Sequence, residues 1–372
     1  MANRTGAPVT ARPPRARLRL PEHFPIRRVI QAVLLILIVV GFTYGTWKTL
    51  TLPKTSPRHF SSSAWRDLMV FGVAEGSVYA MVALGYTMVY GVLRMINFAH
   101  GEVFMTGAFA SFWVAGTLDS SGFLNRNPVL SIAFLILVGM AVSAGVAVLL
   151  ERVAYRPLRN APRLVPLITA IGASLFLQNS VKGFFGPQSQ GYPTIHVIVG
   201  YWKVAGIPIL RVQVLVIVAA LLAMVGLMLF VAKTKTGKSM RAVAEDKEIA
   251  SLMGIDVDKV IVKTFAIGGL LAGMAGVLYA MVFSEVDPLM GFTPGIKAFT
   301  AAVLGGIGSI AGAAIGGLIL GVLESVGPFL LLNGTHVPSP SQLRNVVAFS
   351  ILVLVLIFRP GGILGAGGPE KV

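Results

Sequence analysis

The sequence contains no cysteine and few charged residues. Without cysteine the chain has no disulfide bonds, no thiolate metal ligands and no cysteine nucleophile. Charged residues make up 12% of the 372 positions, about half of the roughly 25% typical of a soluble domain. Most of the surface of such a chain cannot face water, which excludes an ordinary soluble enzyme.

Metal ligands are also scarce. No two of the five histidines have the spacing of a metal-ligand pair on one helix, so we expect no metal site. The net charge of +16 would suggest nucleic acid in a soluble protein. Here Lys and Arg lie mostly between apolar blocks, where they set topology and contact anionic lipid headgroups.

Long apolar blocks fill the rest of the sequence, and 55% of its residues are hydrophobic. Runs of about 18 or more apolar residues are typical of membrane helices. The sequence therefore predicts an all-α, polytopic membrane helix bundle with about eight or nine transmembrane helices plus a re-entrant half-helix. The expected helices cover residues 29–47, 67–93, 98–118, 128–150, 164–181, 210–232, 261–284, 308–327 and 343–358.

Positive charge predicts the orientation. With the amino terminus inside, the inner segments hold about twice as many Lys and Arg as the outer ones. We expect a multi-pass inner-membrane protein with both termini in the cytoplasm. The rule also places loop 233–262 inside and 328–342 outside, which requires an extra crossing: a half-helix at 293–304 and then a span at 308–327. One long tilted helix with the carboxyl tail outside is the alternative.

Glycines predict a break inside this crossing. Gly305, Gly306 and Gly308 are too dense for a continuous helix, because each costs about 1 kcal/mol relative to Ala. Irregular backbone at membrane depth is tolerated only where it is buried in protein or lines a cavity. The three glycines are therefore candidate elements of a substrate pathway.

Polar residues within apolar blocks are further candidates. Asn97, His100 and Glu102 stand at the start of one block, and polar groups at membrane depth often pair or line a wet path. The alternative is a helix start at which Asn97 caps the helix and Glu102 favours its positive end. Glu75 and Tyr79, one turn apart, either bond across a helix interface or line the pathway.

Loop 233–262 contains one apparent motif that we reject. Its residues 232–239 are similar to the end of a phosphate-binding loop, but Ala232 stands where the first glycine is required. The preceding apolar run has the length of a membrane helix and is not a strand, so a nucleotide site is not expected.

The same loop predicts a docking helix. Residues 239–254 have apolar side chains near helical spacing, with Gly254 as a C-cap. A helix with apolar side chains along one face is stabilised when that face packs against a partner. The acids Glu245, Asp246 and Glu248 disfavour anionic lipid, so a groove on another protein is favoured.

Several stretches together carry a resemblance to a known family. The chain resembles the LivH-like permease of bacterial branched-chain amino acid ABC importers from about residue 65 onward. The matching stretches are GYTMVYGVLRMINFAHGE at 85–102, ERVAYRP at 151–157, RAVAED at 241–246, ASLMGI at 250–255 and KAFTAAVLGGIGSIAG at 297–312.

The resemblance implies partners and a division of the chain. It implies a second related permease subunit, two cytoplasmic ATP-binding subunits that hold ATP and Mg, and a periplasmic binding protein that delivers Leu, Ile or Val. This chain then has no cofactor and is not an enzyme. The coupling segment falls on Arg241, Ala244, Glu245, Asp246, Ala250 and Gly254. The expected parts are a disordered basic tail (1–28), an extra anchor helix and periplasmic linker (29–64), the permease domain (65–360) and a cytoplasmic tail (361–372).

Other functions stay open at this point. The same family includes permeases for urea, short amides and other amino acids. A stand-alone channel or ion-coupled carrier is a rival in which Glu75, His100 and Glu102 form a proton path. An assembly subunit without a pathway of its own is a third.

Overall fold

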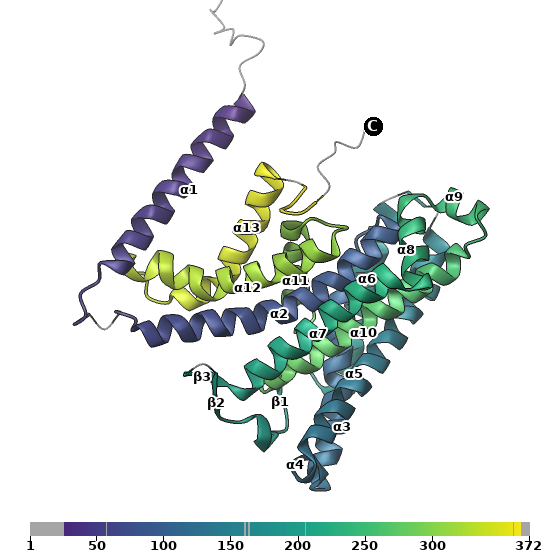
Figure 1. The fold of residues 1–372 in the computed structure, drawn as a ribbon, viewed down its shortest axis with the longest axis horizontal. Helices are drawn as coiled ribbons and strands as arrows, with labels where there is room; N and C mark the ends of the chain where they lie inside the picture. The colour runs from purple at the N-terminus through teal and green to yellow at the C-terminus, as the bar shows by residue number, and fades with distance from the viewer. Residues whose placement is uncertain are drawn as a thin grey trace, which may run out of the picture.

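The computed structural model describes residues 26–365 except 57, 160, 163, 205 and 360. Nearly all of the basic tail predicted at 1–28 lies outside these described residues. The described chain is almost entirely helical (Figure 1). Its α-helices are α1 (Ile26–Leu50), α2 (Ser62–Leu93), α3 (His100–Ser120), α4 (Phe123–Arg126), α5 (Pro128–Leu150), α6 (Leu164–Phe185), α7 (Arg211–Lys233), α8 (Lys235–Glu245), α9 (Lys247–Leu252), α10 (Val257–Phe283), α11 (Phe292–Gly305), α12 (Ile310–Leu332) and α13 (Arg344–Phe358).

Eight of the described helices are long and apolar enough to cross a membrane: α1, α2, α5, α6, α7, α10, α12 and α13. The predicted polytopic helix bundle is therefore confirmed. Helix α3, also predicted to span, packs against α5 and α10. Helix α2 begins five residues before its predicted start at 67, because the Ser61 hydroxyl caps it by accepting a hydrogen bond from the Ala64 N–H (3.3 Å).

Packing of α2 against α12 forms the centre of the bundle. Small residues on one face of α2 meet glycines of α12. A Cβ atom on Gly76 would lie 2.8 Å from the carbonyl oxygen of Gly317, a distance at which no side chain fits. The two backbones therefore approach closely, as small-xxx-small helix pairs do.

The chain between α10 and α12 contains a short irregular segment followed by a half-helix. Segment 284–291 leaves the end of α10, and α11 begins beside the start of α3. A Cβ atom on Gly295 would lie 2.9 Å from the Cα atom of Gly101. Helix α11 ends at Gly305 and α12 begins at Ile310, so the predicted break is present.

Loops of the described chain gather at two ends of the bundle (Figure 1). One end holds α8, α9 and the π-helical turn Glu151–Tyr155. The opposite end holds α4 and two small antiparallel sheets, in which β1 (Gln190–Gly191) pairs with β4 (Glu285–Val286) and β2 (Tyr201–Val204) pairs with β3 (Ile207–Leu210). Short 3-10 turns cover Arg156–Leu158, His196–Ile198, Asn333–Thr335 and Pro340–Leu343.

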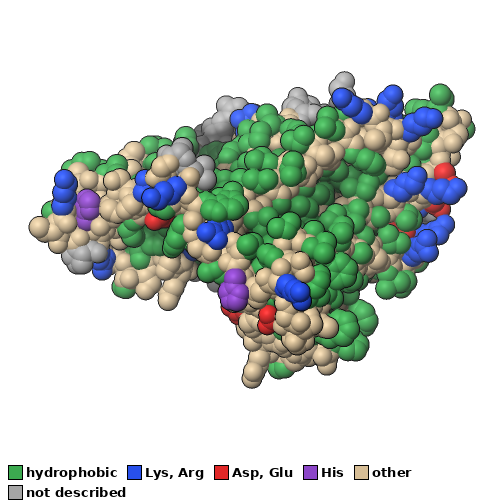
Figure 2. All heavy atoms as spheres, turned by 60° about the horizontal axis from the view of Figure 1, so that its bottom comes forward, with side chains coloured by type: hydrophobic (Ala, Val, Ile, Leu, Met, Phe, Trp, Pro, Cys, Tyr) green, Lys and Arg blue, Asp and Glu red, His purple; other side chains and the backbone are tan. Residues whose placement is uncertain are grey.

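Helix α1 leans away from the bundle and touches it near its carboxyl end (Figure 1). Gly45 packs there against the backbone of Leu331. Figure 2 shows apolar side chains over the middle of one face of the molecule, with many Lys and Arg side chains at the α8–α9 end. This pattern fits a bundle enclosed by lipid with a charged end in water.

Gly317→Leu should disrupt the α2–α12 contact. Its side chain would collide with the backbone of Ala80, and overpacking of this kind costs about 1–3 kcal/mol or more. We expect a lower Tm of the detergent-purified protein. Gly226→Leu on α7 is the matched control, because a Cβ atom there meets nothing within 4 Å. Equal Tm values for the two variants would contradict the packing described here.

Candidate functional site

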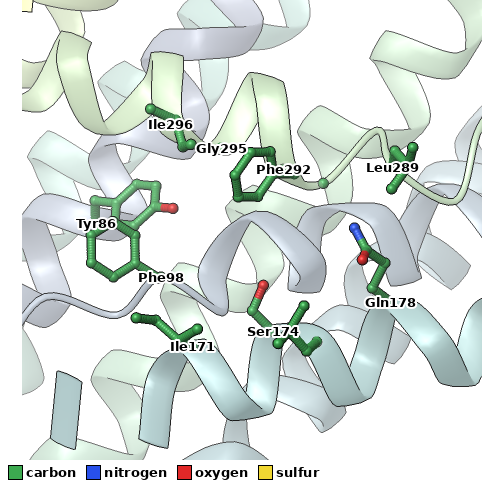
Figure 3. Close-up of a pocket in the computed structure, with 11 residues that line it drawn as sticks. Tyr86, Phe98, Ile171, Ser174, Gln178, Leu289, Phe292, Gly295 and Ile296 are labelled. Atoms are coloured by element: carbon green, nitrogen blue, oxygen red, sulfur yellow. The ribbon is translucent and has the colours of Figure 1, made fainter. Parts of the chain in front are cut away.

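A cavity of about 550 Å³ lies between α2, α6 and α11. In Figure 3, Ile171, Ser174 and Gln178 point from α6 toward the α11 side of the cavity, while Tyr86 and Phe98 close one end. The lining residues are Tyr86, Phe98, Ile171, Ser174, Leu175, Gln178, Leu289, Gly291, Phe292, Gly295 and Ile296. A mostly apolar lining with a few polar groups is typical of small-molecule sites.

The cavity opens toward the side of the bundle. Phe292 is 57% exposed and Leu289 is 52% exposed. The wall of the cavity formed by α11 and the residues just before it is therefore open to the surroundings of the protein. A lateral opening at membrane depth is filled either by lipid or by a neighbouring subunit.

Two helix starts meet at one wall of this cavity. Helix α3 begins at His100 and α11 begins at Phe292, and Gly101 packs against Gly291 and Gly295. The glycines permit this approach because they carry no side chains. Both positive helix ends therefore lie at the same place inside the bundle.

Glu102 lies directly behind this wall, in the first turn of α3. It is 1% exposed. The Ser174 hydroxyl donates a hydrogen bond to Oε1 (3.2 Å), while Oε2 faces Gly291 and has no hydrogen-bond partner among the described residues. Glu102 thus touches two residues that line the cavity. Its predicted role as a substrate contact stays a prediction.

Asn97 and His100 are buried and contact neighbouring aromatic residues, and their predicted place on the substrate pathway stays a prediction. The Tyr155 hydroxyl donates a hydrogen bond to Asn97 Oδ1 (2.6 Å). Ala99, not Asn97, occupies the cap position of α3, and no side chain makes a capping hydrogen bond there, so the alternative in which Asn97 caps this helix is wrong. The His100 ring lies 4.8 Å from the Tyr86 ring and fills a slot beside Gly85.

Glu75 and Tyr79 belong to a buried charge network that ties four helices together. Arg344 on α13 donates to Glu75 Oε2 (2.9 Å), and the Tyr79 hydroxyl donates to Glu75 Oε1 (2.9 Å). Lys297 on α11 donates to the Tyr79 oxygen (3.4 Å) and forms an ion pair with Glu324 on α12. These carboxylates each have a cation and so carry a structural contact across a helix interface.

The three predicted glycines lie at the α8–α9 end of the bundle. Gly306 packs against Gly362 and Gly365, which belong to the last described residues. Gly308 lines a small cleft beside Met240 and Arg241 of α8. None of the three predicted glycines lines the cavity of Figure 3, so the structure places the helix break beside the predicted docking segment.

The carboxyl end of α11 is closed by backbone hydrogen bonds. The N–H groups of Ile363 and Leu364 donate to the carbonyl oxygens of Leu304 and Gly305 (2.8 and 2.9 Å). These carbonyls have no partner within their own helix, so the chain after α13 completes the half-helix.

The predicted docking segment forms two helices instead of one. Asp246 ends α8 and caps α9 by accepting hydrogen bonds from the N–H groups of Glu248 and Ile249 (2.8 and 2.9 Å). Aspartate is a strong N-cap, which explains the break. Gly254 has a φ of +82°, and the Ile255 N–H donates to the Ala250 carbonyl (3.1 Å). The predicted C-cap is therefore confirmed.

The apolar side chains of this docking segment fall into two groups, one buried against the bundle and one exposed. Met240 and Val243 are buried against the bundle, whereas Ile249, Leu252 and Met253 are 60%, 87% and 78% exposed. We define these three side chains as the α9 tip.

Charged residues hold the base of the α9 tip. Arg94 donates to the Ala244 carbonyl (3.3 Å), which joins the end of α2 to α8. Burial, together with the charges of Arg159 and Arg94, lowers the pKa of Lys247. Arg159 also pairs with Glu151 and Asp258. Cationic side chains from separate elements therefore converge beneath the exposed apolar tip.

A multi-pass bundle with a half-helix, a laterally open apolar cavity and an exposed docking element defines a membrane transport protein of the permease class. The chain belongs to the family described as branched-chain amino acid transport system / permease component, whose profile matches residues 68–356. Helix α1 lies before the matched range.

Named relatives agree with this membership. The high-affinity branched-chain amino acid transport system permease protein BraD of Pseudomonas aeruginosa is 45% identical over 82% of this chain and 97% of its own length. The corresponding LivH of Escherichia coli K12 is 43% identical over 82% of this chain and 96% of its own. A probable LivH of Methanocaldococcus jannaschii is 30% identical over 81% and 94%.

The sequence reasoning missed several residues of these sites. Lys297 and Arg344 were not proposed as network partners, although Lys297 is a lone cation in an apolar half-helix and such residues usually have a partner. Ser174 and Gln178 could have been found in the same way, because they are polar residues within the apolar run of α6. The aromatic residues that line the cavity could not have been singled out from the sequence, because aromatic residues are common in any buried helix.

Cysteine substitution tests the cavity, because the chain has no native cysteine. Ser174→Cys should react with a small methanethiosulfonate reagent in detergent, since Ser174 lines the cavity. Ser143→Cys is the matched control, because Ser143 is 0% exposed between helices. The readout is the mass of the intact protein. Equal labelling of both cysteines, or of neither, would contradict an accessible cavity.

Breaking the buried network should destabilise the bundle. Lys297→Met leaves Glu324 without its cation, and loss of one partner of a buried pair costs about 3–5 kcal/mol. We expect a large fall in Tm, partly recovered when Glu324→Gln is added. Exposed Lys263→Met is the control. If Lys297→Met alone leaves the Tm equal to that of the wild type, the ion pair between Lys297 and Glu324 does not stabilise the packing of α11.

Proposed function

We propose that this chain is the membrane-spanning permease subunit of an ATP-driven importer in the bacterial inner membrane, and that it carries leucine, isoleucine or valine. In this proposal a periplasmic binding protein delivers the substrate and a second related permease completes the pathway. Two cytoplasmic subunits bind ATP and Mg and hydrolyse the ATP. The chain itself binds no cofactor and has no catalytic residue.

The observation that carries the proposal is the α9 tip. A cluster of exposed apolar side chains at the charged, water-facing end of a membrane protein favours a protein partner. The acids Asp246 and Glu248 beside the tip disfavour an anionic lipid surface. Since α8 packs against α2, α7 and α10, a force applied to the tip reaches the bundle.

The substrate class is supported by the relatives and by the cavity. BraD and LivH are named as branched-chain amino acid permeases. An apolar cavity of about 550 Å³ has room for a branched side chain and disfavours a small polar substrate such as urea. Glu75, one of the three residues of the rival proton path, is paired with Arg344, which argues against its use as a proton carrier.

The orientation follows from the same proposal. The α8–α9 end lies in the cytoplasm, and the end with α4 and the small sheets faces the periplasm. Coupling residues Arg241, Ala244, Glu245, Asp246, Ala250 and Gly254 then all stand at the cytoplasmic end. The cavity opening beside Phe292 faces the second permease.

Leu252→Asp should uncouple the importer. A charge on the α9 tip would be desolvated in an apolar groove of the ATPase, which costs several kcal/mol. We expect loss of ATPase co-purification and at least about a tenfold fall in ATP-driven leucine uptake by proteoliposomes.

Val199→Asp is the matched control for that experiment. Val199 is 55% exposed at the opposite end of the bundle, so ATPase co-purification should be unchanged. Normal uptake and co-purification by the Leu252→Asp variant would overturn the assignment of the α9 tip.

A further inference from the structure

Charge balance distinguishes one buried carboxylate from the others in the described chain. The four buried glutamates are Glu75, Glu102, Glu151 and Glu324. Three of them have a cation: Arg344, Arg159 and Lys297 pair with Glu75, Glu151 and Glu324, respectively. Glu102 is 1% exposed and forms no ion pair with any described residue; the charge of Lys182 on α6 acts on it only from beyond ion-pair distance. A carboxylate removed from water without a cation is costly.

The position of Glu102 suggests what balances it. Its Oε1 accepts a hydrogen bond from Ser174, and its Oε2 faces Gly291 without a partner. Ser174 and Gly291 both line the apolar cavity. A side chain at position 291 would collide with Oε2, so the glycine leaves room at that wall.

We propose that Glu102, with the Ser174 hydroxyl, holds the α-ammonium group of an amino acid whose apolar side chain occupies the cavity of Figure 3. This inference rests on the proposed function and names the residue that recognises the charged end of the substrate. The Ser174 oxygen can accept a hydrogen bond from the ammonium while it donates to Glu102.

The rest of the cavity fits the other groups of such a ligand. Ile171, Phe292 and Ile296 offer apolar surface to a branched side chain. The starts of α3 and α11 bring two positive helix ends to the same wall, where a ligand carboxylate is favoured. Gln178 and Tyr86 supply polar groups at the lining. A neutral apolar ligand would use neither the acid nor the helix ends.

Ligand binding to the detergent-purified permease complex tests the inference. Three probes are compared by titration: leucine, isopentylamine, which lacks the carboxylate, and 4-methylpentanoate, which lacks the ammonium. We expect leucine to bind about 10- to 100-fold more tightly than 4-methylpentanoate, the range expected for a hydrogen bond to a charged group. Glu102→Gln should abolish this preference, and isopentylamine should lose affinity with it.

Two further variants make the result specific. Asp119→Asn removes an exposed acid from the same helix and should bind all three probes as the wild type does. Glu102→Asp keeps the carboxylate and should retain part of the preference, even if Glu102→Gln fails to fold.

Results that contradict the role of Glu102 can be told apart from results that contradict the proposed function. Wild-type protein that binds leucine and 4-methylpentanoate equally, or binds neither, would overturn the inference, and so would a Glu102→Gln variant that keeps the preference. If ATP-driven leucine uptake persists in those cases, the proposed function survives and the role of Glu102 alone is lost. If uptake is absent from the wild-type complex, the proposed function fails.

Discussion

Irregular backbone inside a membrane must be enclosed by protein, because lipid offers it no hydrogen bonds. Two stretches of this chain face that constraint: the loop between α2 and α3, and segment 284–291 before α11. Both end at helix starts that pack against one another through Gly101, Gly291 and Gly295. The apolar cavity and Glu102 lie beside this junction, so enclosing the irregular backbone also creates the candidate site.

The same half-helix links the two ends of the molecule. At its start α11 lines the cavity, at its middle Lys297 joins it to α12, and at its end Gly305 adjoins the break near α8. In the proposed importer, movement of α8 by an ATPase would act on the neighbouring end of α11. A rigid half-helix of 14 residues is a direct way to carry such movement to the cavity wall.

Much of the fold could be predicted because long apolar runs and glycine spacing are local signals. The span at 67–93 and the Gly305–Ser309 break both follow from neighbouring residues. The site is harder, because a cavity is formed by residues distant in sequence: Ser174 meets Glu102 across 72 positions. Sequence reasoning named Glu102 by its polarity within an apolar block, but it could not separate that acid from Glu75, which has a cation in the fold.

The crossing of 284–309 is the central claim, and its sidedness is the most direct test. Single cysteines placed at Glu285 and Ile307 in the cysteine-free chain can be labelled with a membrane-impermeant maleimide in intact cells and in inverted vesicles. The account predicts that the first reacts only from the periplasm and the second only from the cytoplasm. Labelling of both from the same face would contradict it.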